Sequence, residues 1–383
     1  MTNVPPIRDR RRMLRDLMIG SLTVPLLAAT ARAHTVRPPS ALSASDLVLP
    51  DSATMLVAGP AGGMLDRWSR VLAPLLARAL PLETGVRRTA VGAPDGVTGA
   101  NQFGARVVPD GQTLLLAPGD AALAWLVGDP RAQYDVARWV PVLATLSSAV
   151  VFLRAGVRTA GRVRLASTGS AGVDLPATLG LAMLGGQVEL LPVLPGEGRP
   201  GEVRLGENRP GDSRLESRLG AVAQGDLDAV LIRGHRVEDQ ARALVSAGAR
   251  PLFAFGAPDP NGRLVRSPLF PDVPTFAELF ALSQGRRPMG PLFEGWCAAA
   301  TAAQMEFALV LPELTPAALV ASWRRAGNET ASTLDLQAVV RANDLRIVSG
   351  ADMSAASTLL AADQAALLSL RHWQADHANR RPA

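Results

Sequence analysis

Lysine is absent from this 383-residue sequence, and cysteine and tyrosine occur once each. Without lysine the chain can form neither a Schiff base through a side-chain amine nor the lysine–phosphate contact of a P-loop. The single cysteine, Cys297, excludes an intramolecular disulfide. Its neighbours Trp296 and Ala298 to Ala300 are apolar, so we expect a buried, inert thiol rather than a nucleophile.

Signatures of catalysis and of metal binding are also missing. The sequence has no HExxH, CxxC or Gly-x-Ser-x-Gly motif, and its glycine loops match neither the dinucleotide-binding fingerprint nor the P-loop. The only histidines are His34, His235, His372 and His377, and the last two are expected to be solvated near the C-terminus. We therefore predict a protein that is not an enzyme and holds no metal or cofactor. A hydrolase or transferase of the α/β class stays open as an alternative.

Positive charge is concentrated at the N-terminus. Residues 1–33 contain six arginines and two aspartates, which accounts for +4 of the net charge of +5. An apolar run from Leu17 to Ala31 follows the basic region, and Ala31-Arg32-Ala33 forms a small-x-small cleavage site. Residues 1–33 are therefore predicted to be an export signal, because the run is shorter than the roughly 20 residues of a membrane span. The nearly neutral remainder argues against a nucleic-acid partner.

The export route has a second clue. Arg10-Arg11-Arg12-Met13-Leu14-Arg15 resembles the twin-arginine motif, although the ordinary secretion route stays open. Either route predicts a periplasmic protein whose mature chain begins near His34. Residues 34–50 are polar, with proline and serine, and are predicted to be a flexible start to that chain.

Short apolar runs alternate with helical periods along the rest of the chain. The first run, Ala53 to Ala58, is broken by Gly59-Pro60-Ala61-Gly62-Gly63, and apolar residues at helical spacing follow from Leu65 to Ala79. Further strands are predicted at Thr113–Ala117, Val140–Ala144, Ala149–Leu153, Val188–Val193, Ala229–Ile232 and Pro251–Phe255. The chain after Pro312 is predicted to be mostly helical. This alternation indicates an α/β architecture with largely parallel sheets.

Residues 196–218 interrupt that pattern. Arg199-Pro200-Gly201 is repeated ten residues later as Arg209-Pro210-Gly211, and the segment is rich in charge, glycine and proline. A segment without a core-forming pattern is predicted to be a surface insertion.

Two glycine loops are candidate anion sites. Gly62 and Gly63 lie between a predicted strand and a predicted helix, where backbone N–H groups and the helix dipole favour negative charge. The segment 167–172, Ser-Thr-Gly-Ser-Ala-Gly, follows another apolar run, and its hydroxyls are donors for a carboxylate. Facing each other, the two loops would clamp one carboxylate. An ordinary tight turn is the alternative for each loop.

An ordered set of motifs resembles the solute-binding proteins of tripartite tricarboxylate transporters, the Bug family. Pro60-Ala61-Gly62-Gly63 with Asp66 resembles the family's first loop and helix, and residues 169–172 its second ligand loop. The segment 109–115, Pro-Asp-Gly-Gln-Thr-Leu-Leu, and the segment 269–278, Leu-Phe-Pro-Asp-Val-Pro-Thr-Phe-Ala-Glu, are also similar to family segments. The resemblance covers about residues 48–300.

The resemblance implies a type II periplasmic-binding-protein fold, with two α/β lobes and a ligand cleft between them. Lobe 1 would comprise residues 51–147 and 256–383, and lobe 2 residues 148–255. The expected partners are a small carboxylate ligand and the membrane permease subunits of such a transporter, and the protein is expected to be a monomer. Carried over, the ligand contacts fall on Ala61, Gly62, Gly63, Asp66, Thr168, Gly169, Ser170 and Gly172.

The sequence departs from the family in the helix after the second loop, where Thr178-Leu179 and Ala182 replace its His-Leu and Glu pattern. The ligand is therefore left open. Presentation of the closed protein to a signalling receptor, instead of a permease, is a further alternative.

Overall fold

The computed structural model describes residues 52–80, 85–168, 171–192 and 213–378. All of them belong to one unit, which spans residues 44–383. The predicted export signal (1–33), the predicted flexible start (34–50) and residues 196–212 of the predicted insertion lie outside the described residues. Residues 213–218 of that insertion form the first half of a helix.

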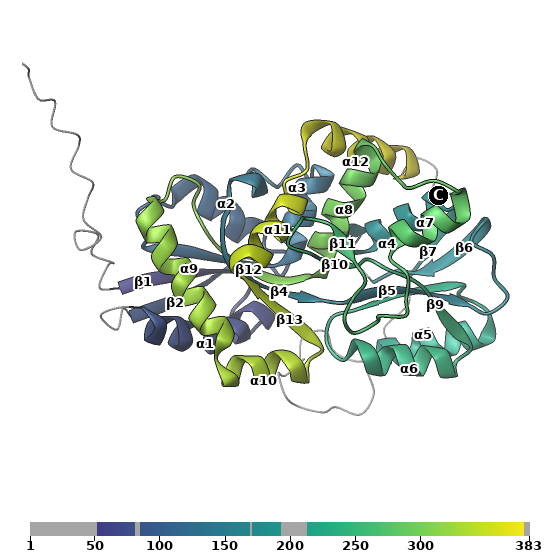
Figure 1. The fold of residues 1–383 in the computed structure, drawn as a ribbon, viewed down its shortest axis with the longest axis horizontal. Helices are drawn as coiled ribbons and strands as arrows, with labels where there is room; N and C mark the ends of the chain where they lie inside the picture. The colour runs from purple at the N-terminus through teal and green to yellow at the C-terminus, as the bar shows by residue number, and fades with distance from the viewer. Residues whose placement is uncertain (1–51, 81–84, 169–170, 193–212, 379–383) are drawn as a thin grey trace, which may run out of the picture. The chain divides into compact units, whose positions relative to one another are not determined.

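Two sheets organise the chain (Figure 1). The six-stranded sheet has the order β13-β4-β12-β3-β1-β2, and the five-stranded sheet has the order β7-β6-β8-β5-β9. The six strands are β1 (Ser52–Ala58), β2 (Gly85–Val91), β3 (Thr113–Ala117), β4 (Val140–Ser147), β12 (Met305–Leu311) and β13 (Leu345–Ser349). The five are β5 (Ala149–Arg154), β6 (Gly161–Ala166), β7 (Gly186–Leu191), β8 (Ala229–Arg233) and β9 (Ala249–Ala254).

Both sheets are mixed, which corrects the prediction of largely parallel sheets. Strands β1, β2 and β3 run parallel to one another, as do β6, β7 and β8. Strand β12 is antiparallel to β3 and β4, and β5 is antiparallel to β8 and β9. The reason is that the chain leaves the first sheet after β4 and returns to it with β12, which lies between β4 and β3 and runs opposite to both.

Helices cover the sheets, and a short hairpin of β10 (Ala257–Pro258) and β11 (Leu264–Val265) follows β9. The first six helices are α1 (Met64–Ala79), α2 (Val97–Arg106), α3 (Gly119–Val127), α4 (Ala171–Met183), α5 (Ser213–Gln224) and α6 (Val237–Ser246). The others are α7 (Phe276–Gln284), α8 (Pro291–Gln304), α9 (Ala317–Ser332), α10 (Leu334–Ala342), α11 (Gly350–Leu360) and α12 (Gln364–Ala378).

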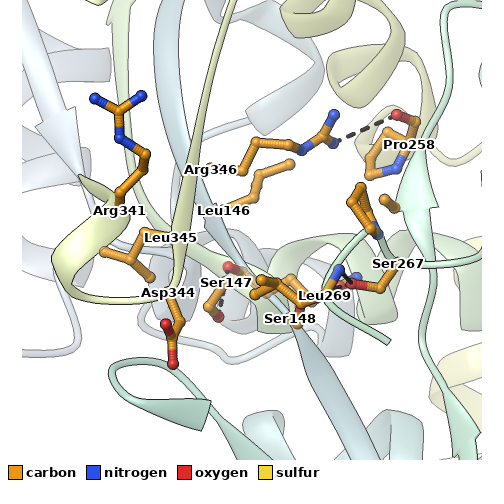
Figure 2. A pocket seen from close by; sticks show the side chains of 13 residues that line it. Leu146, Ser147, Ser148, Pro258, Ser267, Leu269, Arg341, Asp344, Leu345 and Arg346 are labelled. Atoms are coloured by element: carbon orange, nitrogen blue, oxygen red, sulfur yellow. Dashed lines mark hydrogen bonds between the residues drawn. The ribbon is translucent and has the colours of Figure 1, made fainter. Parts of the chain in front are cut away.

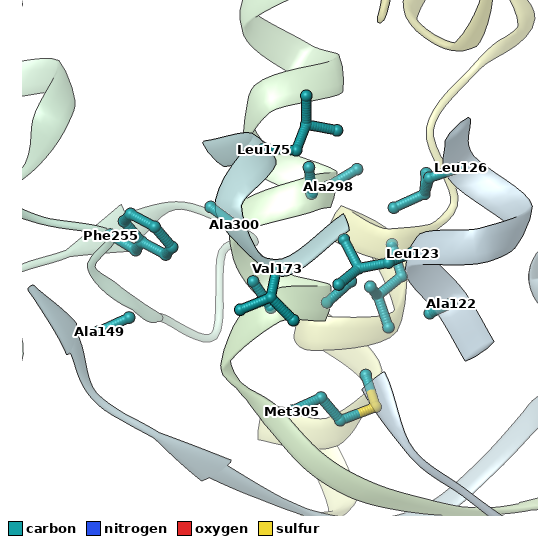
Figure 3. Packing of buried hydrophobic residues seen from close by; sticks show 14 of the residues in the cluster. Ala122, Leu123, Leu126, Ala149, Val173, Leu175, Phe255, Ala298, Ala300 and Met305 are labelled. Atoms are coloured by element: carbon teal, nitrogen blue, oxygen red, sulfur yellow. The ribbon is translucent and has the colours of Figure 1, made fainter. Parts of the chain in front are cut away.

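Helix α8 lies at the centre of the largest buried cluster. It packs against α3, α4, α11 and α12, and the cluster includes residues from both sheets, such as Leu115 of β3 and Leu231 of β8. Figure 3 shows Leu123, Val173 and Ala298 within it. A second cluster joins the six-stranded sheet to α1, α9 and α10, and a third joins the five-stranded sheet to α5 and α6.

The predicted strands are confirmed, with small shifts of their ends. Thr113–Ala117 is predicted with its observed bounds, and Ala53–Ala58 lacks one residue. The sequence analysis missed β2, β6, β12 and β13, and β13 interrupts the C-terminal part that it predicted to be mostly helical. Among the described residues no single helix is long and apolar enough to cross a membrane, although α11 and α12 pass that test as a pair bent by 58°.

Asp228 ties three strands of the five-stranded sheet together. Its carboxylate accepts hydrogen bonds from Arg154 Nη2 (2.8 Å), Arg164 Nε (2.9 Å) and the Arg164 backbone N–H (3.1 Å). Burial raises the pKa of Asp228, but the hydrogen bonds of the two arginines outweigh burial and lower the pKa to about 2. This aspartate therefore has a structural role.

We expect Asp228 to make stability depend on acid pH. Because its folded-state pKa lies below the ordinary 3.8, its contribution is complete above about pH 4 and is lost as the pH falls toward 2. At pH 7, Asp228→Asn should lower the free energy of unfolding by roughly 2 kcal/mol at most, because the arginines are partly exposed. Urea unfolding at several pH values should show that the difference in unfolding free energy between the wild type and Asp228→Asn becomes smaller below pH 4. Asp226→Asn, at an exposed position of the same turn, is the matched control. A difference in unfolding free energy between the wild type and Asp228→Asn that does not change with pH would contradict this role.

Candidate functional site

The loops that follow parallel strands make up the candidate site. Open α/β sheets bind ligands outside the carboxyl ends of their strands. In the six-stranded sheet the loop 59–63 connects β1 to α1, and in the five-stranded sheet the loop 167–170 connects β6 to α4. These are the two loops that the sequence predicts to hold an anion.

In the first loop, backbone geometry depends on Gly62. Its φ of +75° lies in the left-handed region that glycine adopts readily. Pro60, Ala61 and Gly62 are exposed, so no bulky side chain fills the loop. The Gly63 N–H donates to the Pro60 carbonyl (3.1 Å), and the Gly62 N–H donates to Asp66 Oδ2 (2.8 Å). One of the predicted ligand-binding amides is thus already bound to a carboxylate of the chain itself.

Asp66 is a buried anchor for that loop, with 7% of its surface exposed. Besides Gly62 it accepts from Arg70 Nη2 (2.8 Å) and Arg88 Nη1 (3.3 Å). Burial raises the pKa of Asp66, but the Gly62 amide and the two arginines outweigh burial and hold the pKa below its ordinary value. Asp66 is therefore ionised at neutral pH and fixes the loop to α1 and β2.

The second loop has an anchor of the same kind. Asp174, in the first turn of α4, is fully buried and accepts from Ser167 Oγ (2.7 Å) and from the Thr168 N–H, at 3.0 Å to each carboxylate oxygen. Burial raises the pKa of Asp174, although these hydrogen bonds oppose it. Gly169 and Ser170, the predicted centre of this loop, lie outside the described residues.

The start of α4 lies against α3, the helix that follows β3. A Cβ atom added to Gly172 would lie 3.2 Å from Leu123 Cβ, closer than most real contacts of this kind. The structure thus brings Gly172 next to α3, a helix that follows a strand of the six-stranded sheet. The convergence of Ala61, Gly62 and Gly63 with the second loop on one ligand stays a prediction.

A charged cluster that combines residues of α3, β8 and β12 was missed by the sequence analysis. Arg233 ends β8 and donates through Nη1 to the Ala303 carbonyl (2.9 Å). His235 Nε2 lies 3.6 Å from Glu306 Oε1, and Glu306 is 6% exposed. Burial raises the pKa of Asp120, with Arg233 opposing and Glu306 reinforcing this effect. Of these residues, only Arg233 could have been singled out from the sequence, because it ends an apolar strand.

The structure also has a cavity whose lining contains none of the residues of this charged cluster. This cavity of about 240 Å³ lies where the chain crosses between the sheets, lined in part by Ser147, Ser148 and Gln304 (Figure 2). Neither glycine loop lines it.

Groups for metal or thiol chemistry are not assembled in the described part of the chain. Within it, no three histidine, cysteine or acidic side chains are grouped to hold a metal ion. Burial, reinforced by the charge of Glu294, raises the pKa of the Cys297 thiol to about 12, so this half-buried thiol is un-ionised at neutral pH.

Comparisons with known proteins support the fold through structure alone. The sequence matches no protein-family model, and no curated protein matches it. A TctC solute-binding protein from Polaromonas aligns over 83% of this chain and 97% of its own, with 15% identity and a TM-score of 0.56. A Rhodopseudomonas palustris protein solved with adipate aligns over 87% and 99%, with 16% identity and a TM-score of 0.47. The chain therefore has the two-sheet α/β fold of a TctC solute-binding protein, as its resemblance to the Bug family predicts.

Proposed function

We propose that this protein is an extracytoplasmic solute-binding protein that captures a small carboxylate-bearing molecule for a tripartite tricarboxylate-type transporter. One observation carries the proposal. Each sheet ends in a strand-to-helix loop whose amide is already bound by an aspartate of the following helix, Gly62 by Asp66 and Thr168 by Asp174. This anchoring supports a role for both loops in presenting backbone donors to a ligand.

The ligand would bind the backbone N–H groups that are not already bound by Asp66 and Asp174. Gly63, the residue that caps α1, makes no side-chain capping hydrogen bond, so the first-turn amides of α1 and their dipole remain for an anion. Asp66 and Asp174 act as positioning residues that hold the loops before the ligand arrives, which reduces the ordering cost of binding. This assignment replaces a direct ligand contact for Asp66.

Recognition of the rest of the ligand is assigned to the charged cluster. Arg233 uses one guanidinium nitrogen for the Ala303 carbonyl, and its remaining donors suit a second acceptor group. Asp120 and Glu306 add negative charge close by and would disfavour a second anionic group on the ligand. A molecule with one carboxylate and polar neutral groups fits this balance of charge.

The lobe division belongs to the same proposal. Strands from residues 52–147 and 305–349 share one sheet, and strands from residues 149–254 form the other. Lobes 51–147 with 256–383 and 148–255 would close around the crossing at Ser147 and Ser148, with the ligand between them. Residues 1–33 would direct export to the periplasm, where the closed form docks on permease subunits. The proposal is of a binding protein and not of an enzyme.

A thermal-shift screen tests this function. We expect one or a few compounds in a panel of mono-, di- and tricarboxylates, aromatic acids and amino acids to raise the unfolding temperature, because a ligand at 100 times its Kd adds about 2.7 kcal/mol of apparent stability. The amide or alcohol analogue of each hit is its matched control and should have no effect. Hits that bind as well without the carboxylate, or turnover of a hit, would refute the proposal.

A further inference from the structure

The cavity in Figure 2 is bordered by both connections between the sheets. One connection contributes Ser147 and Ser148, between β4 and β5. The other contributes the hairpin region that follows β9, and Gln304 at the return into β12. The complete lining consists of Leu146, Ser147, Ser148, Ala257, Pro258, Ser267, Pro268, Leu269, Gln304, Arg341, Asp344, Leu345 and Arg346. An occupant would therefore touch both crossings at once.

Arg346 is an incompletely paired charge in this cavity. It lies on β13, and within the described part of the chain its guanidinium makes one hydrogen bond, from Nη2 to the Pro258 carbonyl at 3.4 Å, a long contact (Figure 2). Among the described residues no carboxylate is within salt-bridge distance of Arg346, and Asp352 acts on it only through its charge. Arg346 is partly buried, and burial lowers its pKa while the charge of Asp352 opposes this effect. A charge that is partly removed from water is stabilised by a group of opposite sign, which an anion in the cavity would supply.

Hydroxyl groups complete the donor set. Ser148 Oγ and Ser267 Oγ are 2.7 Å apart, so one donates to the other and one hydroxyl proton remains for a ligand. Arg341 adds a second positive charge at an exposed part of the lining. Asp344, the acidic residue of the lining, is turned away from Arg346 in Figure 2 and accepts from the Glu238 N–H of α6 (3.2 Å). The lining is largely apolar, and its charged side chains are two arginines and one aspartate, so positive charge is in excess among its polar groups.

We call this cavity, which borders both connections between the sheets, the hinge cavity. We propose that it is a second binding site, specific for a small oxyanion such as phosphate or a short carboxylate. Arg346 would neutralise the anion, and the Ser148–Ser267 pair would donate one hydrogen bond. The volume of about 240 Å³ admits such an anion. The site is separate from the two glycine loops, and the inference does not depend on the proposed function. Because the occupant contacts both crossings, it would stabilise the arrangement of the sheets seen in this structure.

Isothermal titration of the full chain with inorganic phosphate, and in parallel with succinate, tests this site at constant ionic strength set with sodium chloride. We expect saturable binding of at least one probe. Arg346→Gln should weaken that binding at least tenfold, and Arg346→Lys should restore part of it because the charge is kept. Arg78→Gln, at an exposed position of α1, is the matched control and should bind as the wild type does.

Three results would overturn the inference: no saturable binding of either probe, binding that Arg346→Gln leaves intact, or binding that is lost in a variant of the first glycine loop. Unfolding temperatures without probe establish that each variant is folded, and the lysine variant serves if the glutamine variant is not. Ala61→Asp in the first glycine loop should leave binding at the hinge unchanged. A loss of binding in that variant would place the anion at the glycine loops instead, and would refute a separate site while leaving the proposed function standing.

Discussion

Ala61→Asp is expected to weaken binding of the best carboxylate ligand at least ~100-fold. Ala61 is exposed in the loop between β1 and α1, so the new side chain reaches solvent and the fold is kept. Two like charges about 4 Å apart repel each other by about 4 kcal/mol at an effective dielectric constant of about 20. A loss of about 2.7 kcal/mol already corresponds to 100-fold in Kd. Isothermal titration with a ligand from the thermal-shift screen measures this change.

Ala61→Asn is the matched control, because asparagine has nearly the same shape as aspartate without the charge. It should bind within about threefold of the wild type. The charge effect should also shrink as salt is added, since exposed charges are screened over roughly 8–10 Å at physiological salt. Equal affinities of the aspartate and asparagine variants would show that no ligand carboxylate lies near this loop.

Trp296→Ala is expected to cost about 4 kcal/mol of folding free energy, within the range of large aromatic truncations. Trp296 of α8 is 1% exposed, and its ring centroid lies 4.4 Å from that of Phe276 and 5.9 Å from that of Phe255. Its indole N–H donates to the Pro176 carbonyl of α4 (2.8 Å). The residue therefore joins α8 to the helix that carries the second loop's anchor, and urea unfolding measures its contribution.

Trp296→Phe separates packing from hydrogen bonding. Phenylalanine keeps most of the aromatic contacts and leaves the Pro176 carbonyl without its donor, so the expected cost is about 1–3 kcal/mol. If the alanine variant lost no more stability than the phenylalanine variant, the aromatic cluster would not be the main support of α8.

The strands that the sequence predicted are mostly uninterrupted apolar runs, although β12 was missed despite its apolar run 307–311. Thr113–Ala117 is such a run, and it is found with its predicted bounds as the buried strand β3. Strands β2 and β6 were missed because arginines interrupt them. Arg88 of the edge strand β2 binds Asp66, and Arg164 of β6 binds Asp228. A charged residue within a strand can be explained only when its partner is known. The partner of Arg164, Asp228, lies 64 residues further along the chain.

The positions of the two candidate loops in the fold were predictable, but their internal hydrogen bonds were not. The glycine loops were found because a strand, a glycine loop and a helix follow one another in sequence, and Gly62 adopts a left-handed backbone that glycine tolerates. Capture of the Gly62 amide by Asp66 was not foreseen, since it depends on how the first turn of α1 folds back on the loop. The Arg233 cluster combines residues from β8, α3 and β12, which no local pattern in the sequence connects.

A crystal structure of the mature protein with its tightest carboxylate ligand tests the central claim most directly. The account predicts that the ligand carboxylate accepts hydrogen bonds from backbone amides of residues 61–65 and of residues 168–172, with Asp66 and Asp174 still bound to their own loops. A ligand whose carboxylate is held elsewhere, with neither loop in contact, would contradict it.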